Sequence, residues 1–104
     1  MKIQINTDNH ITGREKLANE AEAAVENALG RFATQITRVE VHLSDENSHK
    51  GGEKDKRCAM EARLEGRQPV AVTHEADTIT QAITGAAAKL ERSLDSTLGK
   101  LRGH

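Results

Sequence analysis

Aromatic side chains are nearly absent from this sequence of 104 residues, which has one Phe and no Trp or Tyr. Proteins that bind single-stranded nucleic acid by stacking bases on aromatic rings need such rings, so a stacking platform of this kind is excluded. Cysteine also occurs only once, at Cys58. A single cysteine excludes an internal disulfide and fits a reducing compartment, so we expect a cytoplasmic protein.

Long apolar runs are missing as well. No segment approaches the roughly 18 apolar residues of a membrane span. The first residues also lack the basic-then-apolar profile of a secretory signal, so we expect no membrane association. The formal net charge is −1, with 15 Lys and Arg against 16 Asp and Glu. A polyanionic partner would therefore have to be bound by a local patch of cations. The length predicts a single domain over residues 1–104.

Four segments show the alternation of apolar and polar side chains that is typical of half-buried strands. They cover residues 1–6, 36–44, 57–64 and a last segment that Pro69 opens and that ends near His74. Proline at the start of the last strand predicts that it lies at an edge of the sheet. The polar stretch between the second and third strands, residues 45–55, predicts a long loop.

Two segments show apolar side chains at every third or fourth residue, which is typical of amphipathic helices. They cover residues 14–32 and 77–101. Thr12 and Glu15 have the spacing of a capping box, which predicts the start of the first helix. Asp77 or Thr78 can cap the start of the second helix.

The resulting order is β-α-β-β-β-α. The last three strands follow one another directly and predict an antiparallel meander, whereas the helix between the first two strands predicts a parallel pair. Each strand has only one apolar face, so both helices should cover one face of a four-stranded sheet. The sequence therefore predicts an α+β two-layer sandwich with one open sheet face.

Two groups of cations could contact phosphates. The first group shares one exposed flank of the second predicted helix: Lys89, Arg92 and Lys100. The second group lies on the open face of the predicted sheet: Arg38, Arg57 and Arg63. The alternative is an ordinary solvated surface, which the neighbouring residues Glu40, Glu61 and Glu91 favour.

Motifs typical of catalysis are missing, including a glycine-rich phosphate loop, a nucleophile elbow and the HExxH zinc motif. His42 could pair with His74 or Cys58 as metal ligands, but Cys58 belongs to an apolar strand face and His42 to a polar one. Cys58 is better explained as a small core residue. We expect no enzyme, no metal site, no cofactor and no small-molecule substrate.

The order of the elements and the second helix resemble the ribosome hibernation-promoting factors, also called ribosome-associated inhibitors or sigma-54 modulation proteins. The most specific likeness is Ala82-Ile83 followed by Lys89-Leu90-Glu91-Arg92-Ser93-Leu94. Weaker likenesses are Val-Glu-Val-His-Leu-Ser at residues 39–44 and Gly30-Arg31-Phe32 at the end of the first helix. The resemblance covers essentially the whole chain.

This resemblance implies the two-layer fold described above, which is similar in outline to a double-stranded-RNA-binding domain. It also implies binding to the small ribosomal subunit and its 16S rRNA, in the channel for messenger and transfer RNA. Such binding blocks translation in stationary phase or stress and can favour paired, inactive ribosomes. By the same resemblance, Lys89 and Arg92 fall on basic positions of the second helix, and Arg31 on one near the end of the first. We expect a monomer in solution.

The first helix differs from that family, because Glu22 and Glu26 replace lysines that are usual there. The tyrosine usual near the start of the second helix is also missing, and Ile79 has its spacing. These differences favour a second hypothesis, a protein-interaction or regulatory module that keeps the fold without binding RNA. An acidic helix face could dock a basic protein.

Overall fold

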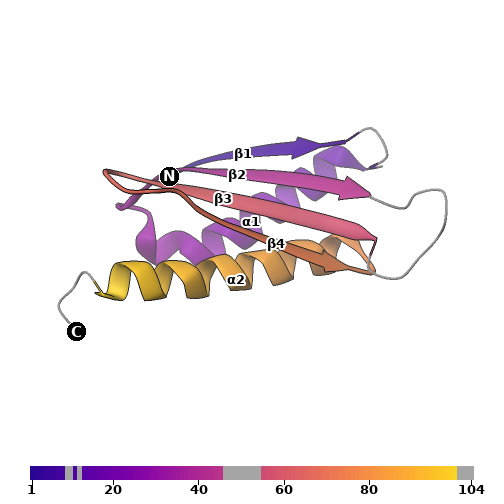
Figure 1. Ribbon diagram of the computed structural model, residues 1–104. Helices are drawn as coiled ribbons and strands as arrows, with labels where there is room; N and C mark the ends of the chain where they lie inside the picture. The colour runs from indigo at the N-terminus through magenta and orange to yellow at the C-terminus, as the bar shows by residue number, and fades with distance from the viewer. Residues whose placement is uncertain (9–10, 12, 46–54, 101–104) are drawn as a thin grey trace.

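The structure is a computed structural model that describes residues 1–8, 11, 13–45 and 55–100, without the side chains of residues 99 and 100. Its elements follow the predicted order (Figure 1): β1 (Lys2–Thr7), α1 (Arg14–Leu29), a 3-10 helix (Gly30–Phe32), β2 (Ile36–Asp45), β3 (Lys56–Leu64), β4 (Val70–Ala76) and α2 (Ile79–Lys100). The α+β class is confirmed. None of the helices in the described ranges is long and apolar enough to cross a membrane.

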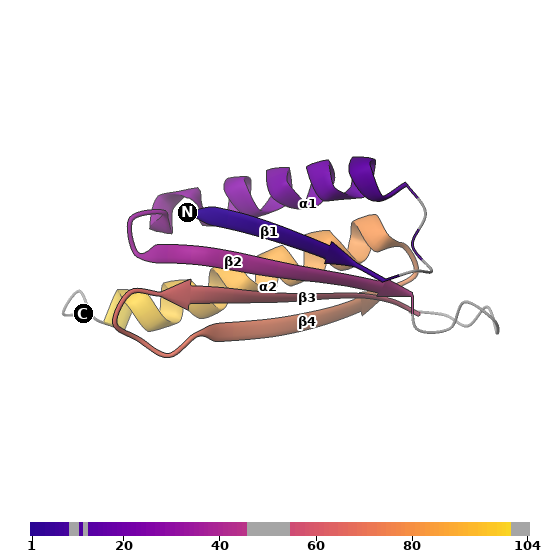
Figure 2. The ribbon, with the colours of Figure 1, turned by 90° about the horizontal axis from the view of Figure 1, so that it is seen from above.

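The four strands form one sheet in the order β1-β2-β3-β4. β1 is parallel to β2, as expected for strands joined by a helical crossover, and the other two pairs are antiparallel. Both helices cover the same face of the sheet, and the opposite face is open (Figures 1 and 2). The predicted two-layer arrangement is therefore confirmed.

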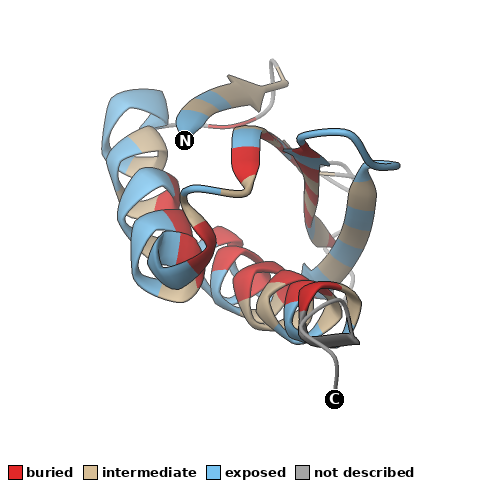
Figure 3. Ribbon diagram, turned by 90° about the vertical axis from the view of Figure 1, so that its left-hand side faces the viewer, coloured by how far each residue is buried: buried red, intermediate tan, exposed pale blue. Residues whose placement is uncertain are grey.

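The core lies between the sheet and the two helices, where the buried residues of the helices and of the other strands face one another and the half-buried Ile3 and Ile5 of β1 pack against them (Figure 3). Every second residue points inward from Val39 to Leu43 of β2 and from Cys58 to Leu64 of β3, as the alternation predicts. These inward residues are Val39, Val41, Leu43, Cys58, Met60, Ala62 and Leu64. α2 contributes Leu90 and Leu94, neither of which has any exposed surface. The core is thus largely aliphatic, with Phe32 as its one aromatic side chain.

The helix ends differ in part from the prediction. α1 starts at Arg14 as predicted, but its cap residue is Gly13, which has a positive φ of 67° and no side-chain cap bond. The predicted cap residue, Thr12, lies outside the described residues. The α-helix also ends at Leu29, earlier than predicted, and the tighter 3-10 helix continues the chain to Phe32. At α2 the prediction is confirmed, because the Thr78 hydroxyl accepts a hydrogen bond of 3.1 Å from the backbone N–H of Gln81.

β4 is an edge strand, as the proline at position 69 predicts, and it extends two residues beyond His74 because Glu75 and Ala76 pair with β3. The predicted loop between β2 and β3 falls mostly on residues 46–54, which lie outside the described residues. The two ends of this loop are held by Lys56, whose Nζ lies 3.3 Å from Asp45 and 3.0 Å from Asp55. The hydrogen bond to Asp55 is the main reason that the pKa of Lys56 is raised.

Candidate nucleic-acid interface

A groove runs between the exposed edge of β4 and one flank of α2. It consists of two adjoining hollows of about 840 and 610 Å³, which share Val70 and Thr97. Three cationic side chains line the groove: Lys89, Arg92 and Arg67. No carboxylate lies among the described residues that line it. The groove is therefore a local cationic surface on a chain whose net charge is close to zero.

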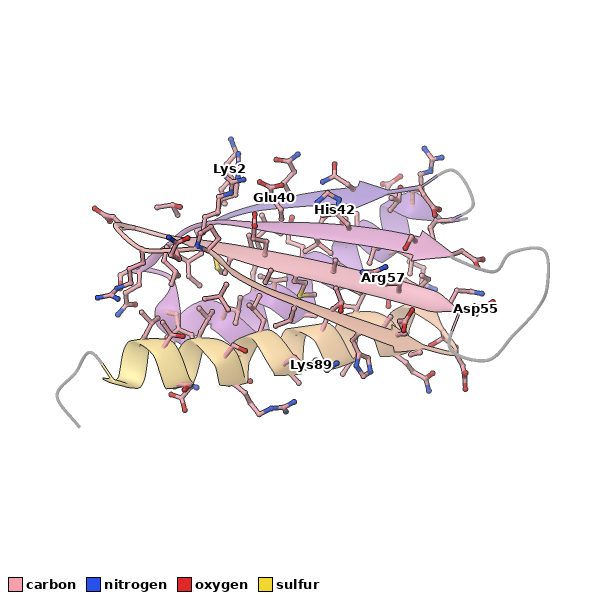
Figure 4. All side chains as sticks on the ribbon, in the orientation of Figure 1. Lys2, Glu40, His42, Asp55, Arg57 and Lys89 are labelled. Atoms are coloured by element: carbon pink, nitrogen blue, oxygen red, sulfur yellow. The ribbon has the colours of Figure 1, made fainter. Side chains whose placement is uncertain are left out.

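Lys89 joins the two walls of this groove. Its Nζ donates a hydrogen bond of 2.9 Å to the backbone carbonyl of Thr73 in β4, and Figure 4 shows Lys89 on α2 beside this strand. The bond satisfies a carbonyl at the exposed edge of the sheet. It uses one of the three donors of the ammonium group, so two donors remain for a ligand in the groove.

Arg92 lies one turn after Lys89 on the same flank of α2 and is exposed. It makes no ion pair with any carboxylate in the described part of the chain. The predicted pairing of Lys89 and Arg92 on one surface is therefore what the structure shows. Lys100 is the last residue of α2, but its side chain lies outside the described atoms.

Besides Gln68, the structure adds to the groove lining four polar residues that the sequence analysis missed. Arg67 comes from the turn between β3 and β4, whereas Ser93, Ser96 and Thr97 come from α2. The three hydroxyl residues follow Lys89 at intervals of four, seven and eight residues, which a helical projection of the sequence could have shown. Arg67 could not be found in this way, because only the tertiary structure brings its turn next to α2.

Arg31, the third position implied by the family resemblance, lies on the opposite flank of α2. Its guanidinium is 3.5 Å from Glu91 and 3.3 Å from Asp95, and its Cζ lies 4.3 Å from the centre of the Phe32 ring. Arg31 therefore ties the end of the first helical segment to α2. The structure does not bring it together with Lys89 and Arg92.

The predicted cations of the sheet lie on its open face, but carboxylates lie between them. Arg38 and Arg63 both contact Glu40, at 2.7 and 3.4 Å, and Arg63 also contacts Glu61 at 3.3 Å. Lys2 pairs in register with Arg38, so one end of this face carries three cations (Figure 4). These ion pairs offset much of the positive charge of Arg38 and Arg63. The described lining of the groove contains no carboxylate that could offset its cations in the same way.

Arg57 lies on the same open face near its other end, opposite Glu75 in the register of β3 and β4. It is exposed and makes contacts of its own with the rest of the protein. Arg57 is therefore separated from Arg38 and Arg63 by the row that contains Glu40 and Glu61.

His42 and Cys58 lie on opposite faces of the sheet, as predicted. His42 is exposed on the open face, where its Nε2 lies 3.9 Å from Glu40, whereas Cys58 is fully buried. Burial raises the pKa of the Cys58 thiol to about 12. Within the described ranges, no three His, Cys, Asp or Glu side chains are placed to hold a metal ion together.

Several solved structures are similar to this chain, among them the following two. The N-terminal domain of Protein Y from Thermus thermophilus has a TM-score of 0.74 and 18% identity, over 93% of this chain and 99% of that one. A ribosomal subunit interface protein from Coxiella burnetii has a TM-score of 0.68 and 16% identity, over 95% and 99% of the two chains. At such low identities these likenesses show the fold alone.

Among curated proteins, none matches the sequence significantly. A sequence model of the family described as "Sigma 54 modulation protein / S30EA ribosomal protein" matches residues 3–102. This match spans both helices, the strands except the first residue of β1, and the whole cationic groove. The chain therefore belongs to the Sigma 54 modulation protein / S30EA ribosomal protein family.

Proposed function

We propose that the chain is a cytoplasmic, ribosome-associated factor that binds the small ribosomal subunit through 16S rRNA. It would occupy the channel for messenger and transfer RNA, and thereby inhibit translation or stabilise inactive ribosomes in stationary phase or stress. The observation that carries this proposal is the groove between β4 and α2, where Lys89 and Arg92 lie together with no carboxylate among the described residues of the lining. Family membership supports the ribosome as the partner.

The physical basis is the charge of the RNA backbone. Each phosphate that a Lys or Arg neutralises releases bound counterions, which adds a salt-dependent increment to the affinity. Because the net charge of the chain is only −1, attraction by the whole protein is negligible, and we assign the affinity to a local cationic surface, the groove. A protein that occupies the channel excludes messenger and transfer RNA by its volume, so inhibition requires no catalytic step.

Co-sedimentation with ribosomes in sucrose gradients tests this proposal. We expect the chain in the fractions of the small subunit, and less of it there as the salt concentration rises. The double variant Lys89→Ala/Arg92→Ala should bind at least about tenfold more weakly, since each contact to a phosphate contributes on the order of 1 kcal/mol. The same variant should lose the ability to inhibit translation in a cell-free system.

A matched control removes two cations elsewhere. Arg14 and Lys16 are exposed at the start of α1 and make no ion pair within the described residues. Arg14→Ala/Lys16→Ala changes the net charge by the same amount and should leave the binding nearly unchanged. Equal loss in both double variants would contradict a role of the groove, and absence of the wild-type chain from every ribosomal fraction would refute the proposed function.

A second function has one observation in its favour, an acidic row on α1. Glu15, Glu22 and Glu26 are exposed, lie along one line of the helix and make no ion pair within the described residues. Such a row favours a module that docks a basic protein and binds no RNA. Recovery of a defined protein partner after nuclease treatment, without ribosomal RNA, would select this function over the first.

A further inference from the structure

We propose that the groove between β4 and α2 binds RNA in double-helical form through its sugar–phosphate backbone, and that the hydroxyls of Ser93, Ser96 and Thr97 select RNA over DNA. This inference rests on the proposed function and specifies the form of RNA that the groove accepts. Lys89, Arg92 and Arg67 would supply the affinity for phosphate, which RNA and DNA share. The three hydroxyl residues would supply the discrimination.

The hydroxyls of the groove have unused hydrogen-bonding capacity. Serine and threonine inside a helix often donate to the carbonyl four residues earlier, and Thr84 does so on this same helix, with a bond of 3.0 Å to Thr80. By contrast, Ser93, Ser96 and Thr97 have no side-chain hydrogen bond to any described residue. Their donors and acceptors are therefore free for a ligand in the groove.

A free hydroxyl suits the ribose 2′-OH, which is both a donor and an acceptor and which DNA lacks. Lys89, Ser93 and Ser96 follow one another along the groove at about one helical turn, or roughly 5.4 Å. Cations and hydroxyls are thus interleaved along one wall. The minor groove of an A-form helix presents phosphates and 2′-hydroxyls side by side, so its backbone offers the complementary pattern.

The aromatic content argues against single strands as the preferred ligand. The only aromatic residue of the chain is Phe32, which is 2% exposed and lies beneath Arg31 on the other flank of α2. Among the described residues that line the groove there is also no His, Tyr or Trp, so bases splayed from a single strand would find no ring there on which to stack. A flexible strand would lose conformational freedom on binding without this compensation, whereas a duplex is already ordered.

Fluorescence anisotropy with three labelled probes tests the inference: an RNA duplex of about 20 base pairs, a DNA duplex of the same sequence and one RNA strand alone. At one low salt concentration, we expect the full chain to bind the RNA duplex at least about tenfold more tightly than either other probe. In the variant Ser93→Ala/Ser96→Ala/Thr97→Val, the affinities for the two duplexes should lie within about twofold of each other. Its affinity for the DNA duplex should not change, which also shows that the variant is folded.

Thr84→Ala is the matched control, because it removes a hydroxyl from the same helix outside the groove lining. It should keep the wild-type preference for RNA. The inference is overturned if the wild-type chain binds both duplexes equally, if it prefers the single strand, or if the triple variant keeps the preference. Co-sedimentation of the wild type with small subunits should be measured in parallel. If the chain binds small subunits but shows no preference among the three probes, the inference fails while the proposed function stands.

Discussion

The imidazole ring of His74 in β4 fills the space in which a side chain at Gly85 of α2 would begin. The helix and the edge strand are therefore in close contact at this point, and they are joined again one turn later by the bond from Lys89 to Thr73. These two contacts lie where α2 meets β4, beside the core packing that holds the helix on the sheet. The cationic groove lies between the same two elements.

Replacement of Gly85 by Ala should destabilise the protein. Alanine usually stabilises a helix relative to glycine by about 1 kcal/mol, but here its Cβ would overlap with the His74 ring. Overpacking of this kind costs about 1–3 kcal/mol, so we expect a lower free energy of unfolding in urea titrations followed by circular dichroism. The double variant Gly85→Ala/His74→Ala should recover most of the loss. Gly30→Ala is the control, since nothing lies within 4 Å of a Cβ there.

The salt dependence of RNA binding should report the number of phosphates that the groove contacts. In a plot of log K against log salt concentration, Lys89→Ala and Arg92→Ala should each reduce the slope by about one. The measurement is a series of binding titrations with one RNA at several salt concentrations. An unchanged slope with weaker binding would mean that these side chains act on the shape of the groove and not on phosphates.

Arg31→Ala should affect stability more than RNA binding. Its partners Glu91 and Asp95 are exposed, so the ion pairs and the contact with Phe32 together contribute only about 0.5–1.5 kcal/mol. We expect thermal unfolding to shift downward by a few degrees and the affinity for RNA to stay within about twofold. A loss of affinity as large as that of Arg92→Ala would place Arg31 in the RNA interface after all.

Glu40→Gln should both destabilise the fold and make the open sheet face more basic. The Glu40 side chain is 18% exposed and holds Arg38 and Arg63 close together. Without its charge, the two guanidinium groups repel each other, and we expect a loss of about 1–3 kcal/mol in urea unfolding. Glu61→Gln should cost less, because among the described residues Glu61 makes an ion pair with Arg63 alone and is 36% exposed. If Glu40→Gln and Glu61→Gln lowered the free energy of unfolding equally, the contact of Glu40 with both arginines would have no special role.

The buried thiol of Cys58 should make the protein less stable in alkali. Its pKa is raised from 9.0 to about 12 by burial, so above pH 9 the unfolded chain loses this proton and the native chain keeps it. The free energy of unfolding should therefore fall by up to about 1.4 kcal/mol per pH unit above pH 9. Below pH 9 the thiol is protonated in both the native and the unfolded chain, so it adds no pH dependence to the free energy of unfolding.

The comparison of the wild type with Cys58→Ala in urea, between pH 8 and 10.5, isolates this effect. Lys56 also has a raised pKa, and its stabilising charge is lost only above its ordinary value of 10.5. We expect the free energy of unfolding to fall less between pH 8 and 10.5 in Cys58→Ala than in the wild type. Identical pH profiles of the two proteins would contradict the assignment, as would rapid reaction of native Cys58 with a thiol reagent at pH 8.

The sequence alone determined the order of the elements, the parallel and antiparallel pairing and the two faces of each strand. Val39 and Arg38 point to opposite sides of the sheet because neighbouring side chains of any strand alternate. For the same local reason, Lys89 and Arg92 share one flank of α2. Such features depend only on spacing within one element, so they can be predicted without the rest of the molecule.

The tertiary structure alone decided what that flank of α2 faces. Arg67 lies 22 residues before Lys89 in the sequence, and the core packing that seats α2 on β4 brings both to one groove. Arg31 could be expected to join them by its charge, yet Glu91 and Asp95 hold it on the opposite flank. Surfaces built from distant segments depend on how closely those segments pack, and here the lack of a side chain at Gly85 lets the His74 ring approach the helix.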